Sequence, residues 1–251
     1  MAKTITVAGK GGVGKTAISS LLIDALSKKG VVLAIDADPS TNLNEALGME
    51  LSGTIGQARE DLTDAIQKGS LTPGVAKQDV LEMRIREAMV ESSKIDLLAM
   101  GRPEGPGCYC AANHMLRQSI DRLAKSYDYV VTDSEAGMEH ISRQTTQDVD
   151  FLLIVSDPTM RGVNAAGRVK DLIKEMRTKV GKVSMVVNRV RNGLPQEIGK
   201  AVADFGLDLI AAIPEDPNLP DLEIKGKPVI DLPEDSPLKK GVQEIIAKFG
   251  L

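Results

Sequence analysis

The chain has 251 residues, of which 42% are hydrophobic and 2% aromatic, and its formal net charge at pH 7 is −4. This length and hydrophobic fraction suffice for one large α/β domain with an aliphatic core. The scarcity of aromatic rings argues against binding of single-stranded nucleic acid by base stacking, and the negative charge disfavours a general nucleic-acid or membrane surface. We therefore expect no nucleic-acid partner and no stable membrane association.

Short apolar runs alternate with helical patterns along the chain. The expected strands lie at 4–8, 31–36, 95–100, 129–133, 151–155, 183–188 and 207–213, and the expected helices at 16–28, 111–125, 139–147, 162–178, 195–204 and 236–249. Runs this apolar are typical of strands buried on both faces of a parallel sheet. The alternation predicts an α/β fold with a doubly wound, mostly parallel sheet and helices on both faces, and ligands bind such sheets at the carboxyl ends of the strands.

Residues 50–94 depart from this alternation, because they are charged and helix-compatible and contain Gly53, Gly69 and Pro73 as punctuation. We interpret them as a helical insertion after the second strand, within a single domain that spans 1–251. The final helix, at 236–249, carries an apolar stripe. Such a stripe suits either packing on the sheet or attachment to a membrane surface, and we expect packing.

The most informative segment follows the first strand, where residues 9–16 read Gly-Lys-Gly-Gly-Val-Gly-Lys-Thr. Strand, glycine-rich loop and helix together form a phosphate-binding loop. Its glycines let several N–H groups point at one phosphate chain, at the positive end of the helix dipole. We expect Lys15 to reach the β- and γ-phosphates and the Thr16 hydroxyl to bind Mg²⁺. The nucleotide-binding residues predicted here are Gly11, Gly12, Val13, Gly14, Lys15, Thr16 and Ala17.

Lys10 is a second lysine in this loop. With it, the motif resembles the deviant phosphate-binding loop of the MinD/ParA/nitrogenase-iron-protein class of dimeric P-loop ATPases. The resemblance implies a homodimer with ATP at its interface, in which Lys10 reaches the nucleotide of the other subunit. Many members carry a second hydroxyl where this chain has Ala17, so one contact to the α-phosphate is absent here.

Carboxylates follow two of the expected strands, with Asp38 after the second and Asp133 at the end of the fourth. One carboxylate can hold the Mg²⁺ shell while another orients a water for attack on the γ-phosphate. The resemblance implies that Asp38 positions the water, that Asp133 contacts Mg²⁺ through water, and that Gly137 follows the γ-phosphate. Aspartates at strand ends also cap helices. The predicted catalytic set is Lys10, Lys15, Asp38 and Asp133.

Two further loops follow the last two strands. Asn188 and Arg189 end the sixth strand, and Pro214 and Glu215 end the seventh. The resemblance implies that these loops hold the adenine, with the Asn188 amide on the purine edge and backbone contacts from the Pro214 loop. Asn and Pro also favour ordinary turns.

Cys108 and Cys110 are the two cysteines of the chain. They are too close for an ordinary structural disulfide, but two thiolates at i and i+2 can bind one soft ion such as Zn²⁺. One pair supplies half of a tetrahedral site, and a two-fold dimer would bring a second pair. His114 is a further candidate ligand within one chain, and two ordinary loop cysteines remain the alternative.

This cysteine pair, joined to the ATPase motifs, resembles the nickel-handling ATPases CooC and AcsF, which mature carbon monoxide dehydrogenase and acetyl-CoA synthase. The matching segments are Lys10–Thr16, Cys108-x-Cys110, residues 133–140, Asn188-Arg189 and Pro214. The resemblance implies that two cysteine pairs meet across the dimer to bind nickel or zinc, and that the client is carbon monoxide dehydrogenase or acetyl-CoA synthase. The nitrogenase iron protein fits less well, because residues 136–137 are Ala-Gly with no cysteine nearby.

Two other classes stay open at this point: a positioning ATPase that binds DNA or membrane, and an electron-transfer ATPase with an iron–sulfur cluster. The sequence starts directly on a strand pattern rather than on a signal segment, and it has no apolar stretch of about 18 residues. We expect a cytoplasmic protein.

Overall fold

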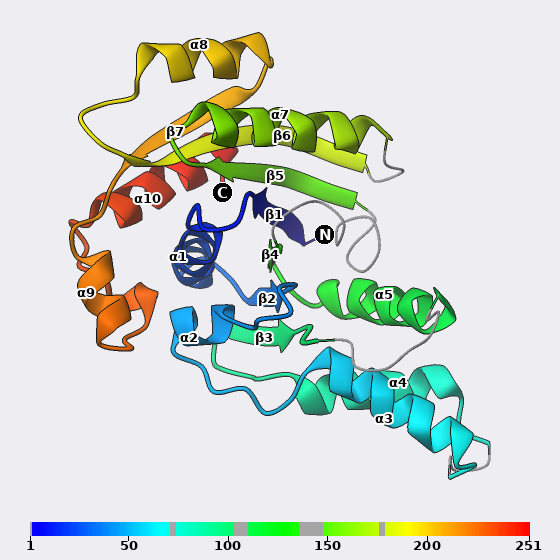
Figure 1. Ribbon diagram of the computed structural model, residues 1–251. Helices are drawn as coiled ribbons and strands as arrows, with labels where there is room; N and C mark the ends of the chain where they lie inside the picture. The colour runs from blue at the N-terminus through cyan, green and yellow to red at the C-terminus, as the bar shows by residue number, and fades with distance from the viewer. Residues whose placement is uncertain (1, 71–73, 103–109, 136–147, 176–178) are drawn as a thin grey trace.

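The computed structural model describes residues 2–70, 74–102, 110–135, 148–175 and 179–251 (Figure 1). Side chains are described in the same ranges, except for residues 110–115, 117, 174 and 175.

One sheet runs through the described part of the chain. Its strands are β1 (Lys3–Gly9), β2 (Val32–Asp36), β3 (Ile95–Ala99), β4 (Tyr129–Asp133), β5 (Asp148–Ser156), β6 (Lys179–Val190) and β7 (Asp208–Pro214). They lie in the order β3-β2-β4-β1-β5-β6-β7, and neighbouring strands pair in parallel. The predicted parallel, doubly wound sheet is therefore confirmed.

Helices cover both faces of this sheet (Figure 1). They are α1 (Lys15–Ser27), α2 (Leu43–Leu47), α3 (Ile55–Gln67), α4 (Lys77–Ala88), α5 (Cys110–Ala124), α7 (Met160–Glu175), α8 (Gln196–Asp204), α9 (Leu219–Ile224) and α10 (Pro237–Phe249), with a 3₁₀ turn at Val229–Asp231. Alternate side chains of each strand point to opposite faces. On one face the strands form a core with α1, α2 and α10, and on the other they form cores with α7 and α8 and with α3, α4 and α5.

The segment at 50–94 contains α3 and α4, which pack against each other, and α4 also packs against α5. Near the C-terminus, α10 packs against β7 and α1. Its apolar side chains are buried, namely Leu238, Val242, Ile245, Ile246 and Phe249. The stripe seen in the sequence therefore contributes to the core.

Several boundaries differ from the sequence expectations. Strand β6 begins at Lys179 rather than at 183, because pairing with β5 extends to Asp148↔Lys179, beyond the apolar run. Helix α7 begins at Met160, two residues before the expected start, and the expected end at 178 lies outside the described residues. The short helices α2 and α9 were not expected, and the expected helix at 139–147 lies outside the described residues.

Candidate nucleotide-binding site

The loop from Lys10 to Gly14 joins the end of β1 to the start of α1 at the carboxyl edge of the sheet. Gly12 and Gly14 have φ values of 77° and 91°, in the left-handed region that side chains disfavour. A Cβ on Gly14 would also lie 2.6 Å from the Nδ2 atom of Asn188. The glycines are therefore required by the backbone path, and that path is the curled loop which the sequence predicts.

Lys15 lies inside this loop with 8% of its surface exposed. Its ammonium donates a hydrogen bond to the Lys10 carbonyl oxygen at 3.2 Å. Burial lowers the pKa of Lys15, and the negative charges of Asp133 and Asp38 oppose that shift. A polyphosphate bound in the loop would give this cation a partner of opposite charge.

Asp133 ends β4 directly beside the start of α1. Its Oδ2 atom accepts a hydrogen bond from the Thr16 hydroxyl at 2.7 Å, and its Oδ1 atom accepts one from the Ser19 hydroxyl at 2.9 Å. Asp133 is 1% exposed, and burial raises its pKa to about 7. The structure thus brings together the two predicted Mg²⁺ residues, Thr16 and Asp133. Sequence analysis missed Ser19, although its i+3 spacing from Thr16 places both hydroxyls on one helix face.

Asp36 was also missed, and it lies next to Asp133 as its register partner on β2. Its carboxylate accepts hydrogen bonds from the backbone N–H of Asp38 at 3.0 Å and of Leu43 at 2.9 Å. Burial raises the pKa of Asp36 to about 6. Asp36 therefore holds the turn that carries Asp38, whose own carboxylate accepts a bond from the Ser40 N–H at 2.8 Å. The signal for this role is the Asp-x-Asp pattern at a strand end, which favours Asx turns.

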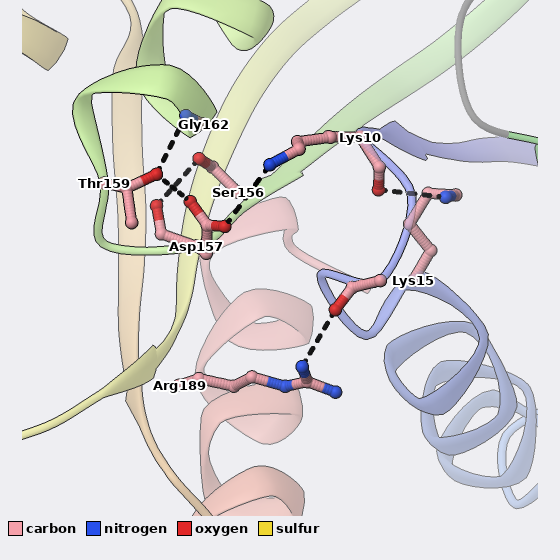
Figure 2. A network of polar contacts seen from close by, with 8 residues as sticks. Lys10, Lys15, Ser156, Asp157, Thr159, Gly162 and Arg189 are labelled. Carbon is pink, nitrogen blue, oxygen red and sulfur yellow. Dashed lines mark hydrogen bonds and ion pairs between the residues drawn. The ribbon is translucent and has the colours of Figure 1, made fainter.

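Lys10 points away from Lys15, toward the end of β5 (Figure 2). Its Nζ atom lies 3.9 Å from the Oδ2 atom of Asp157, and its side chain is 48% exposed. The Thr159 hydroxyl donates to the other Asp157 oxygen at 2.5 Å, and the Gly162 N–H donates to Thr159 at 3.1 Å. Asp157 is thus held by the start of α7 and presents one oxygen to Lys10. No sequence motif pointed to Asp157.

The end of β6 contacts the phosphate-binding loop directly. Asn188 is 4% exposed, and its Nδ2 atom donates to the Val13 carbonyl oxygen at 2.9 Å. The Nη1 atom of Arg189 donates to the Gly12 carbonyl oxygen at 2.8 Å, and Figure 2 shows this side chain reaching the loop before Lys15. Two residues predicted to hold adenine therefore contact the loop backbone in this structure.

Pro214 and Glu215 lie at the neighbouring strand end. The Glu215 carboxylate accepts two hydrogen bonds from the Arg191 guanidinium, at 2.5 and 2.7 Å, and its N–H donates to the Val190 carbonyl oxygen. A cavity of about 380 Å³ opens here. Its lining residues are Pro158, Arg189, Arg191, Pro195 and Glu215.

Asp216, which follows, was missed by the sequence analysis. It is 6% exposed and accepts bonds from the Ser236 hydroxyl and from the N–H groups of Asn218 and Leu238. These bonds fix the loop after β7 to the start of α10.

Three predicted site residues cannot be placed in this way. Gly137 and Cys108 lie outside the described residues, and Cys110 begins α5 but its side chain is not described. Among the residues that the structure does describe, no group of three or more His, Cys, Asp or Glu side chains is arranged to hold a metal ion. None of the helices in the described ranges is long and apolar enough to cross a membrane.

The described donors fit a magnesium nucleotide. The left-handed glycines give the loop the curvature of a phosphate cradle, Lys15 supplies a buried cation, and Thr16 with Asp133 supplies oxygen ligands of the type that Mg²⁺ prefers. Residues 4–229 match the family model of the CobQ/CobB/MinD/ParA nucleotide binding domain. This chain belongs to that family.

Individual relatives agree with this assignment. An uncharacterized ATP-binding protein of Methanocaldococcus jannaschii is 45% identical over 98% of this chain and 97% of its own length. The carbon monoxide dehydrogenase accessory protein CooC of Rhodospirillum rubrum is 34% identical over 84% of this chain and 83% of its own. The MinC:MinD cell division protein complex of Aquifex aeolicus has a similar fold, with a TM-score of 0.72 and 25% identity over 99% of this chain and 96% of that one. The predicted P-loop fold of the MinD/ParA type is thereby confirmed.

Proposed function

We propose that this protein is an ATP-dependent metallochaperone: a homodimeric ATPase that binds nickel or zinc through Cys108 and Cys110 of each subunit and delivers the metal to carbon monoxide dehydrogenase or acetyl-CoA synthase. The observation that carries the proposal is the 34% identity to CooC, a carbon monoxide dehydrogenase accessory protein, over most of both chains, in a sequence that also has the Cys-x-Cys pair. In this proposal residues 1–251 act as one domain in the cytoplasm.

Hydrolysis of ATP would use the groups at the carboxyl edge of the sheet. Lys15 and the loop N–H groups bind the phosphates, and Thr16 with Asp133 holds Mg²⁺, which supplies charge stabilisation when bound. Asp38 orients a water toward the γ-phosphorus. The water oxygen forms a new P–O bond and the bond to the β-phosphate oxygen breaks. One water proton stays on the new phosphate, the other passes to solvent, and ADP and phosphate leave. Gly137 responds to the presence of the γ-phosphate. The loops at Asn188–Arg189 and Pro214–Glu215 accommodate the base.

Nucleotide binding can reach the cysteine pair along the chain. Helix α5 begins at Cys110, and the strand that follows it, β4, ends at Asp133. A change at Asp133 that moves β4 and α5 would alter the spacing between the cysteine pairs of two subunits. A coupling of a few kcal/mol is enough to change metal affinity about 100-fold.

The packing of α10 favours this function over membrane positioning. A membrane-surface helix presents its apolar stripe to lipid, whereas Leu238, Val242 and Ile245 of α10 are buried in the core.

The test is metal analysis of the purified full-length dimer, with and without MgATP. We expect one nickel or zinc ion per dimer in the wild type, and a loss of more than 90% of the bound metal in Cys108→Ser and in Cys110→Ser. A His114→Gln variant is expected to bind as much metal as the wild type. A loss of metal in this variant would instead indicate a site that His114 completes within one chain. Equal metal content in the wild type and both cysteine variants would remove the metallochaperone proposal while leaving ATP hydrolysis untouched.

A second prediction concerns the ion pair between Lys10 and Asp157. If Lys10 serves the nucleotide of the other subunit, it must leave Asp157, so Asp157→Asn should lower the ATP concentration needed for dimerisation. The side chains are partly exposed and 3.9 Å apart, so the expected effect is a two- to five-fold shift, about 0.4–1 kcal/mol. Light scattering across an ATP titration measures it.

Asp208→Asn is the matched control, because it removes another exposed lysine–carboxylate pair, Lys182–Asp208, far along the sheet from the loop. A shift of the same size in that control would show a general charge effect and contradict the prediction.

A further inference from the structure

The carbonyl groups of the phosphate-binding loop are almost all held by donors of the protein. The Lys10 carbonyl accepts from the Lys15 ammonium, and the Gly14 carbonyl accepts from the Ile18 N–H at the first turn of α1. Between them, the Gly12 and Val13 carbonyls accept from Arg189 and Asn188. Two adjacent residues at the end of β6 therefore bind two adjacent carbonyls of the loop.

Each of these bonds fixes a whole peptide group. A peptide is planar and trans, so the C=O of one residue and the N–H of the next point in opposite directions from one rigid plane. Arg189 on the Gly12 oxygen thus sets the direction of the Val13 N–H, and Asn188 on the Val13 oxygen sets that of the Gly14 N–H. These are N–H groups of the kind that a phosphate-binding loop turns toward its ligand.

The surroundings of Asn188 and Arg189 hold both side chains in position. The Asn188 side chain is buried, and its Nδ2 atom fills the space where a Cβ on Gly14 would lie, so glycine and amide fit together. Arg189 has a φ of 58°, which is rare for a residue with a long side chain. A strained residue persists when its surroundings hold it, and the hydrogen bond from its guanidinium to Gly12 is one such restraint.

We propose, on the basis of the ATP binding proposed above, that Asn188 and Arg189 are positioning residues that preset the N–H groups of Val13 and Gly14 for phosphate. This role is separate from contact with adenine. It gives affinity for the phosphate chain itself, because the loop does not have to order its peptides when the ligand binds. Removal of either donor frees one peptide group and leaves a loop carbonyl without its protein partner.

The two roles can be separated with a ligand that has phosphates but no base. Isothermal titration of the full chain with MgADP and with magnesium tripolyphosphate compares them directly. We expect Asn188→Ala and Arg189→Ala each to weaken tripolyphosphate binding roughly tenfold. MgADP binding should weaken by at least the same factor, because loss of the base contact proposed above adds to the loss of the preset loop. Arg189→Lys keeps a cationic donor and should recover part of the loss for both ligands. Arg191→Ala removes a guanidinium that contacts Glu215 rather than the loop, so its affinity for tripolyphosphate should stay unchanged.

The outcomes are distinct. A loss of MgADP affinity with unchanged tripolyphosphate affinity in both alanine variants would overturn the inference and assign the residues to the base. A wild type that binds MgADP but no tripolyphosphate would also overturn it, since a preset loop binds phosphates without a base. A wild type that binds neither MgADP nor tripolyphosphate would instead overturn the proposed function. Arg189 is exposed, so Arg189→Ala keeps the test decisive should the buried Asn188→Ala unfold, which thermal melting would report.

Discussion

Replacement of Lys15 by Ala is expected to lower the rate of ATP hydrolysis by at least about a hundredfold, while the protein stays folded. Lys15 is the buried cation of the loop. Its ammonium donates a hydrogen bond to the Lys10 carbonyl oxygen and is attracted by the negative charges of Asp133 and Asp38. Charge that builds up on the phosphates during transfer is stabilised by such a preorganised cation, and removal of one such group typically costs about 10²–10³ in rate. Because burial already disfavours the charged form, removal of the ammonium should cost little folding stability.

Steady-state phosphate release measures this effect, and thermal melting checks the fold. Lys28→Ala is the matched control, since Lys28 lies at the other end of the same helix and pairs with Asp24 on the surface. A Lys15→Ala variant that hydrolyses ATP within threefold of the wild type would contradict the assignment of this loop as a catalytic phosphate site. Equal losses in Lys28→Ala would point to damage of α1 as a whole.

The parts of the site that could be predicted from sequence are those encoded locally. Gly12 and Gly14 must be glycine because of their own φ values, and Thr16 follows them in the first turn of α1. Asp133 was found because it ends an apolar run, and its contact with Thr16 follows once both strand ends share one edge of the sheet.

What the sequence could not supply depends on which strands are neighbours. Lys10 meets Asp157 because β5 lies beside β1, although about 150 residues separate them in the chain. Asn188 contacts Val13 because β6 is only one strand further away and its end turns toward the loop. Strand order follows from the packing of all helices on both faces of the sheet. The apolar sequence of a single strand does not indicate which strands lie beside it. The pairing of Asp36 with Asp133 has the same origin, as adjacent strands β2 and β4 place them in register.

Asp133→Asn should have opposite effects on activity and on stability. The carboxylate is proposed to hold Mg²⁺ with Thr16, so its loss should reduce hydrolysis by at least about a hundredfold. In the absence of nucleotide the ionised carboxylate lowers the free energy of unfolding, because burial raises its pKa from 3.8 to about 7. Well below pH 3.8 both folded and unfolded chains carry the proton. As the pH rises toward 7, the unfolded chain loses it first. The free energy of unfolding therefore falls over this range, by up to about 4 kcal/mol.

The Asn side chain stays neutral at every pH, so the variant should lack this part of the pH dependence. Thr16 and Ser19 hydroxyls can rotate to bond either end of the amide, which keeps their contacts with position 133. Urea unfolding without nucleotide, at pH 5 and pH 8, should show the variant more stable than the wild type at both values, with a clearly larger difference at pH 8 than at pH 5. Addition of MgADP should then stabilise the wild type and leave the variant nearly unchanged. If the stability of the wild type and of the variant changes with pH in parallel, the prediction is contradicted. The Asp133 carboxylate would then be ionised in the folded protein at little cost, stabilised by groups other than the Thr16 and Ser19 hydroxyls.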